Sequence, residues 1–219
     1  MKELDIDNWY KCKIDRKVYK QLTKRSDLQG LKHVSVWIFF LILSGYAAYL
    51  SWGTWWAIPA FLIYGNIFMA CNPVWHECGH RTAFKSRWLN EMFYHIGSFM
   101  YNFEPVRWRW SHFHHHSYTL HTNPYDYEIQ VTKPTDLFYV FLMHLPGGNL
   151  LLIFKGILSF HWETIKHACG ITTPVMKDCI PENERPKCRF YSRLHISIWL
   201  LIIAYSIFIS SWIPVMLIL

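Results

Sequence analysis

The sequence contains no C-x-x-C pair among its six cysteines, which lie at positions 12, 71, 78, 169, 179 and 188. This spacing fits neither a zinc ribbon nor the dense disulfide framework of a small secreted protein, so we expect free thiols. The chain also lacks a G-x-G-x-x-G run and a haem-attachment motif. A dinucleotide site and a covalently attached haem are therefore not predicted.

Charged residues are scarce as well, at 17% of the chain, whereas 52% of the residues are hydrophobic and 18% are aromatic. A water-soluble domain with this composition would expose much apolar surface, so we expect a membrane to be its solvent. The formal net charge is +7, but the cationic residues flank long apolar runs and form no polar domain. This distribution predicts an integral membrane protein without a nucleic-acid partner.

Two apolar runs, residues 33–50 and 55–74, each approach the length of about 20 residues that crosses a hydrocarbon core. Because only the residues SWGT join them, we expect a tight helical hairpin. Nine Lys or Arg residues precede the first run, and further cations follow the second at Arg81, Lys85 and Arg87. The positive-inside rule then places both ends of the hairpin in the cytosol, including a basic N-terminal segment of residues 1–32.

The second half of the chain is expected to return to the membrane. Residues 137–160 are apolar but are broken by His144 and the PGGN run after it, which favours a re-entrant or interfacial helix pair over a full span. Residues 195–209 form a further predicted span, and the final VMLIL begins a return that does not finish. We therefore expect one all-α, multi-pass transmembrane domain over residues 1–219, truncated in its fourth span and part of a longer protein.

The motif HECGH, residues 76–80, permits two interpretations. Read as H-E-x-x-H, it makes His76 and His80 the zinc ligands of a metalloprotease and Glu77 its base. Read as H-x-x-x-H, it is two imidazoles one helical turn apart. Cys78, inside the motif, could bind a soft metal, but we favour packing as a small hydrophobic residue.

A second cluster, WSHFHHHSYT, contains H-x-x-H-H at His112, His115 and His116. On a helix these positions are i, i+3 and i+4, which project from one face. Both clusters fall on the cytosolic side of the predicted spans, so five imidazoles can converge in a histidine-rich layer at the membrane edge. One zinc ion needs only three protein ligands, so five predict more than one metal ion. Nitrogen-rich ligation suits Fe, Cu, Ni or Zn.

An H-x-x-x-H after a hairpin, followed by an H-x-x-H-H on the same side, resembles the membrane fatty acid desaturases and their hydroxylase relatives. The similarity includes the segments HECGHRTAF, KSRWLNEMFY and WRWSHFHHH, and LTKRSD ahead of the first span, so it covers essentially the whole chain. It implies a di-iron enzyme that uses O2 and two electrons to remove hydrogen from an unactivated C–H bond of a fatty acyl chain.

The resemblance also implies roles for particular residues. The two iron ions would be bound by His76, His80, His112, His115 and His116. The other ring nitrogen of each histidine needs an acceptor, and the candidates for that role are Glu77, Asp126 and Glu128. Arg107 and Arg109, interleaved with Trp108 and Trp110, could bind the phosphate of a lipid headgroup, a CoA or an acyl-carrier group. Anchoring at the membrane surface is the favoured interpretation of these two arginines.

The sequence departs from the family pattern in two places. NPYDYEI has Tyr127 where the family often has the proline of an acidic-Pro-Glu motif, and no third histidine box follows. We therefore expect the 219-residue chain by itself to bind little iron and to be inactive.

Electrons would have to come from a separate protein, because the chain shows no redox motif of its own. A ferredoxin or a cytochrome b5 type protein would fit, and the basic cytosolic surface would suit an acidic donor. Desaturation of a fatty acyl lipid is the leading hypothesis. Hydroxylation begins with the same hydrogen abstraction and stays open, as do a membrane zinc metalloprotease and a non-catalytic metal carrier.

Overall fold

The computed structural model describes residues 12–118, 134, 137–138 and 157–218, and the helix pair predicted over residues 137–160 lies largely outside these ranges. Within them the secondary structure is helical, as the composition predicted. The elements are α1 (Arg16–Leu22), α2 (Asp27–Ser51), α3 (Ala57–Met69), α4 (Cys71–Gly79), α5 (Arg87–Met100), α6 (Pro105–Tyr118), α9 (Ile157–Ala168), α10 (Pro174–Cys179), α11 (Arg185–Phe208) and α12 (Ile213–Met216).

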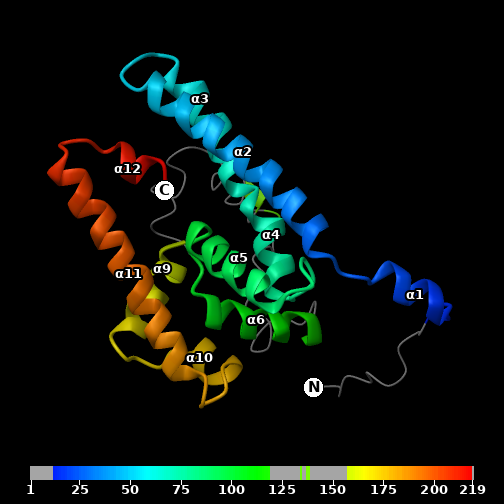
Figure 1. Ribbon diagram of the computed structural model, residues 1–219. Coiled ribbons are helices and arrows are strands. Elements are labelled where there is room, and N and C mark those ends of the chain that lie inside the picture. The colour runs from blue at the N-terminus through cyan, green and yellow to red at the C-terminus, as the bar shows by residue number, and fades with distance from the viewer. Residues whose placement is uncertain (1–11, 119–133, 135–136, 139–156, 219) are drawn as a thin grey trace.

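Helices α2 and α3 form the predicted hairpin, and Figure 1 shows them running side by side. Their connection turns at Gly53, whose φ of +79° lies in the left-handed region that glycine adopts without strain. Helix α4 continues α3 after a break at Ala70. Pro73 accounts for the break, because it has no N–H to donate to the carbonyl of Met69.

Among the residues that the structure describes, three segments are long and apolar enough to cross a membrane: Asp27–Ser51, Ala57–Gly79 and Arg185–Phe208. They correspond to the three apolar runs that the sequence predicted as spans. Apolar side chains cover their outer surfaces, since Phe39 on α2, Ile63 on α3 and Leu201 on α11 are 61%, 59% and 70% exposed. Such surface is unfavourable in water and is matched by hydrocarbon.

Helices α5 and α6 lie between the hairpin and α11, at the end of the hairpin where α4 is found (Figure 1). α4 and α6 both pack on α5, while α10 and α11 also pack on α6. One core cluster joins α2, α4, α5 and α6 and consists of Val34, Trp75, Cys78, Phe84, Leu89, Phe93, Tyr94 and Trp108. Cys78 is fully buried in this cluster, as the sequence analysis favoured.

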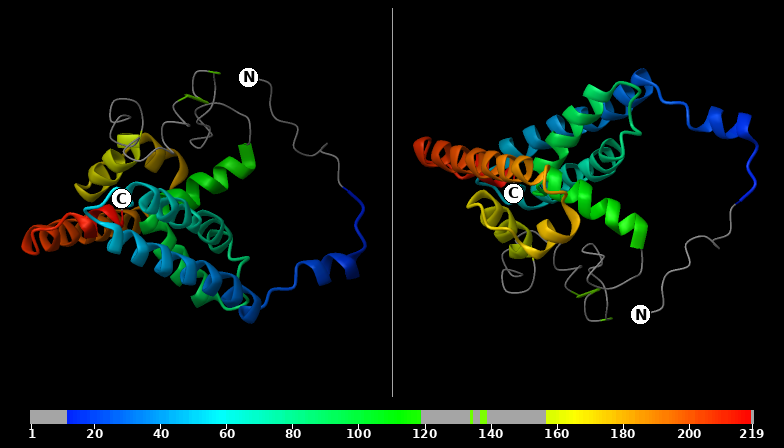
Figure 2. Two further views of the ribbon diagram at one scale, coloured as in Figure 1. Left: turned by 90° about the horizontal axis from the view of Figure 1, so that it is seen from above. Right: turned by 90° about the horizontal axis from the view of Figure 1, so that it is seen from below.

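The N-terminal helix α1 buries none of its side chains and stands apart from the other helices in both views of Figure 2. It is capped by Asp15, whose carboxylate accepts the N–H groups of Lys17 and Val18 at 2.8 and 3.0 Å. A carboxylate at this position satisfies backbone donors that have no partner within the helix.

Candidate metal centre

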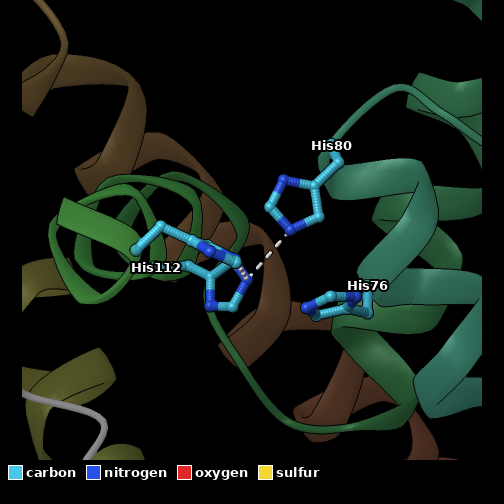
Figure 3. A group of neighbouring side chains, drawn as sticks. His76, His80 and His112 are labelled. Carbon is cyan, nitrogen blue, oxygen red and sulfur yellow. Dashed lines mark hydrogen bonds between the residues drawn. The ribbon is translucent and has the colours of Figure 1, made fainter. Parts of the chain in front are cut away.

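The helix α4, which carries most of HECGH, is held close to α5 through Trp75. The indole Nε1–H of Trp75 donates to Ser98 Oγ at 2.7 Å. A Cβ at Gly97 would lie 2.6 Å from the Cβ of Trp75, so a glycine is required for this close approach of the two helices. His76 and His80 then face α6 (Figure 3).

The helix α6, which carries the second histidine cluster, begins at Pro105 and is capped by Glu104. The Glu104 carboxylate accepts the N–H of Val106 at 3.0 Å and that of Arg107 at 2.6 Å. These oxygen acceptors satisfy backbone N–H groups that have no partner within the helix. This cap fixes where α6 starts and thereby the direction in which its histidines project.

Packing orients the His112 ring independently of any ligand. The ring stacks on the buried Trp108, with centroids 4.3 Å apart and planes inclined by 14°. Trp108 in turn lies 4.1 Å, between ring centroids, from Trp75 on α4. The same aromatic pair therefore sets the spacing of α4 from α6 and the orientation of His112.

Four histidines converge between these helices: His76, His80, His112 and His116. Each offers a ring nitrogen, and these four atoms lie within 4.8 Å of one another. The Nε2 of His112 is 3.0 Å from the Nε2 of His80 and 3.0 Å from the Nε2 of His116. The ring of His76 lies 4.7 Å, between centroids, from those of His80 and His112.

This arrangement fits a metal cation. Nitrogen ligands bound at about 2.1 Å lie about 3.0 Å apart when their bonds to the metal meet at a right angle. Without a cation, the single hydrogen or lone pair on His112 Nε2 faces two ring nitrogens at once. Burial, followed by the neighbouring histidine rings, lowers the pKa of His80 and so favours the neutral form that binds metals. An all-imidazole donor set suits Fe, Cu, Ni or Zn.

His115, the fifth predicted ligand, is near the cluster but outside the group of four. Its ring lies 5.7 Å from that of His112 and 5.8 Å from that of His116, between centroids. Its role as a ligand stays a prediction. Glu77 is exposed, and its carboxylate lies 3.6 Å from His76 Nδ1 while accepting the hydroxyl of Thr82 at 2.5 Å. It is thus close to the outer nitrogen of a clustered histidine.

The remaining predicted site residues are two acidic residues and two arginines. Asp126 and Glu128 lie outside the described residues. The side chain of Arg107 is 4% exposed and its guanidinium is 3.7 Å from Glu163. The side chain of Arg109 is 30% exposed and donates to Glu91 at 3.1 Å. Both arginines therefore contact carboxylates of the protein, and their binding of a headgroup stays a prediction.

Sequence reasoning did not identify Glu91 or the buried polar group that surrounds Glu104. The carboxylate of Glu104 accepts the thiol of Cys188 at 3.0 Å, and the same sulfur lies 3.5 Å from Nδ1 of His167. All three side chains are inaccessible to solvent. Cys188 is 84 residues from Glu104, and no local pattern connects them.

Comparison with known proteins gave one family and several relatives. The model of the fatty acid desaturase family matches residues 50–219. An sn-1 oleoyl-lipid 12-desaturase of Synechocystis sp. is 31% identical over 111 residues, which cover 50% of this chain and 30% of that protein. An sn-1 acyl-lipid omega-3 desaturase (ferredoxin) of Nostoc sp. is 30% identical over 116 residues, covering 48% of this chain and 32% of that protein.

A Delta(12) acyl-lipid conjugase (11E,13E-forming) of Impatiens balsamina is 26% identical over 119 residues, covering 53% of this chain and 29% of that protein. The matched part thus spans less than a third of each of these relatives. No solved structure matches.

Proposed function

Because the chain belongs to the fatty acid desaturase family, we propose that it acts in the oxygen-dependent desaturation of a fatty acyl chain. The reaction removes two hydrogens from adjacent methylene groups and, with two electrons and two protons from a donor, reduces O2 to two waters. The observation that supports this most strongly is the convergence of four imidazoles from two helices, with ring nitrogens at 3.0 Å.

Two iron ions are the proposed metal cofactors, and when bound they would activate O2 for removal of hydrogen from an unactivated C–H bond. The ligands that this chain would supply are His76, His80, His112, His115 and His116. Imidazole binds the metal without adding negative charge beside an oxidising centre. Glu77, beside His76 Nδ1, would hold that ring in its tautomer and orientation, and Asp126 and Glu128 are proposed for the same task.

The substrate is proposed to be an acyl chain carried by a membrane lipid. The helices that flank the histidine layer present apolar side chains, which an acyl chain can contact without loss of hydrogen bonds. The relatives from Synechocystis and Nostoc are both acyl-lipid desaturases by name. Of the two arginines proposed for a headgroup, Arg109 is the more accessible, at 30% exposure against 4% for Arg107.

The proposed electron donor is an acidic ferredoxin or a cytochrome b5 type protein. The Nostoc relative carries ferredoxin in its name, and this chain has a formal net charge of +7. Complementary charge would speed the encounter of the two proteins. The donor, the N-terminal segment and the histidine layer are proposed to share the cytosolic side, as the positive-inside rule predicts.

The test is to express the native reading frame in a membrane that lacks the product and to analyse lipids and metal content. A new double bond is expected, and an alcohol would instead indicate the hydroxylase. The substitution His116→Ala should abolish both product and bound iron, with His114→Ala as the control, because His114 is on the same helix but outside the cluster of four. Peptide cleavage by a His116→Ala protein that keeps its metal would indicate a zinc protease.

A further inference from the structure

Glu91 on α5 contacts both histidine-bearing segments. Its Oε1 accepts the Nε–H of Arg81 at 2.9 Å, and its Oε2 accepts an Nη2–H of Arg109 at 3.1 Å. Arg81 directly follows His80, and Arg109 precedes His112 by three residues, which places it on the same face of α6. One carboxylate thus joins the end of the first histidine motif to the start of the second.

The helix α5 is the common support of the two segments, because α4 and α6 both pack on it. Glu91 is only 28% exposed, and on α5 it follows the buried Asn90. The guanidinium of Arg109 is further fixed over the ring of Tyr94, 4.1 Å from its centroid. Burial raises the pKa of Glu91, but Arg109 and Arg81 outweigh it and leave that pKa below its usual range. Glu91 therefore faces the two arginines as a carboxylate.

The backbone at Arg81 gives an independent reason to regard its side chain as functional. The N–H of Arg81 donates to Cys78 O at 2.9 Å, and that of Thr82 donates to Glu77 O at 2.9 Å. This is a Schellman ending, whose left-handed position is usually occupied by glycine. Here that position has a φ of +59° and is occupied by arginine. An arginine bears a strain there that glycine would avoid, and the contact that its side chain makes is with Glu91.

We propose that Glu91 is a positioning residue for the metal centre: through Arg81 and Arg109 it fixes His80 and His112 at the separation that a shared metal ion requires. The inference rests on the proposed metal centre. The relevant separation is the 3.0 Å between their Nε2 atoms, and metal sites tolerate deviations of about 0.2 Å in ligand distances. Packing of Trp75 on Trp108 brings the helices together, whereas the Glu91 contacts oppose sliding and rotation of one histidine segment against the other.

The test uses the protein expressed from its native reading frame, in detergent, stripped of metal and titrated with Co2+, whose visible absorption reports coordination geometry. Two variants remove the contact differently. Glu91→Gln keeps the side-chain shape but loses the charge. Arg81→Gly loses the side chain but relieves the backbone strain. The control is Glu184→Gln at the N-cap of α11, because the Glu184 side chain is 25% exposed and makes a comparable ion pair with Lys187 at 2.7 Å.

Both variants are expected to bind Co2+ about tenfold more weakly than the wild type, with an altered spectrum, and the control should be unchanged. Arg81→Gly should keep or raise the Tm of the metal-free protein. A purely structural role would lower Tm and Co2+ affinity together. A lower Co2+ affinity with an unchanged or raised Tm therefore indicates a positioning role. Wild-type affinity in both variants would overturn the role of Glu91 and leave the metal centre intact. Absence of Co2+ binding in the wild type would overturn the metal centre and this inference with it.

Discussion

Gly79, the fourth residue of HECGH, determines how closely α4 approaches α6. A Cβ at this position would lie 2.5 Å from Cζ3 of Trp108 and 3.1 Å from Cε2 of Tyr94. Ordinary contact begins near 3.4 Å, so Gly79→Ala requires the Trp108 ring to move by about 0.9 Å. Trp108 is 5% exposed and is packed against Trp75 and His112, so it has little room to move.

Overpacking of this kind costs about 1–3 kcal/mol, which for a chain of this size lowers Tm by about 2–12 °C. Because Trp108 stacks on His112, a displacement of that size also exceeds the tolerance of about 0.2 Å in ligand distances. We therefore expect Gly79→Ala to weaken Co2+ binding as well as to destabilise the protein.

The assay is thermal unfolding in detergent together with Co2+ titration, and Gly65→Ala is the matched control. Gly65 is also helical, but a Cβ there would have nothing within 4 Å. That substitution should leave Co2+ binding unchanged and raise stability by up to about 1 kcal/mol through helix propensity. If Gly79→Ala has the Tm and the affinity of Gly65→Ala, the reasoning from close approach is wrong.

Two further predictions concern stability and topology. Burial raises the pKa of Glu104 from 4.5 to about 7, so its contribution to stability falls as pH rises between these values, by about 3 kcal/mol. Burial lowers the pKa of His167 from 6.5 to about 4, so its contribution to stability grows by about 3 kcal/mol as pH rises from 4 to 6.5. Between pH 4.5 and 6.5 the opposite effects of Glu104 and His167 on stability therefore nearly cancel. Glu104→Gln should therefore give a Tm that rises with pH across that range, and a flat profile would contradict the assignment. Cys12 and Cys169 are the exposed thiols of the described chain, so an impermeant maleimide should label them only from the cytosolic side, and labelling from outside intact cells would reverse the proposed topology.

The spans could be predicted because they depend on local apolar runs, and the convergence of four of the five predicted histidines because both motifs lie on the same side of the predicted spans. The apolar runs became α2, α3 with α4, and α11, and the family resemblance is confirmed by the match to residues 50–219. Relative to His112, His115 is offset by about 60° around the helix to one side and His116 by about 40° to the other. His116 joins the cluster because α4 approaches from its side. A sequence pattern places all three on one face but does not show from which side a partner helix approaches.

Other features of the site depend on contacts that no local pattern records. Glu91 contacts Arg81, which precedes it by 10 residues, and Arg109, which follows it by 18 residues. The need for glycine at position 79 arises from the ring of Trp108 on another helix. Both follow only from the way in which α4 and α6 rest on α5.

The four-histidine cluster also has a bearing on the order of folding. It closes within residues 76–116, and the helices that form it follow one another along the chain. Contacts between near neighbours in sequence form early, and chains are synthesised from the N-terminus at about 5–20 residues per second. Residues 119–219 would thus take about 5–20 s to appear. During these seconds α4, α5 and α6 can pair and take up a first metal ion while the ribosome is still producing α10 and α11, which pack on α6.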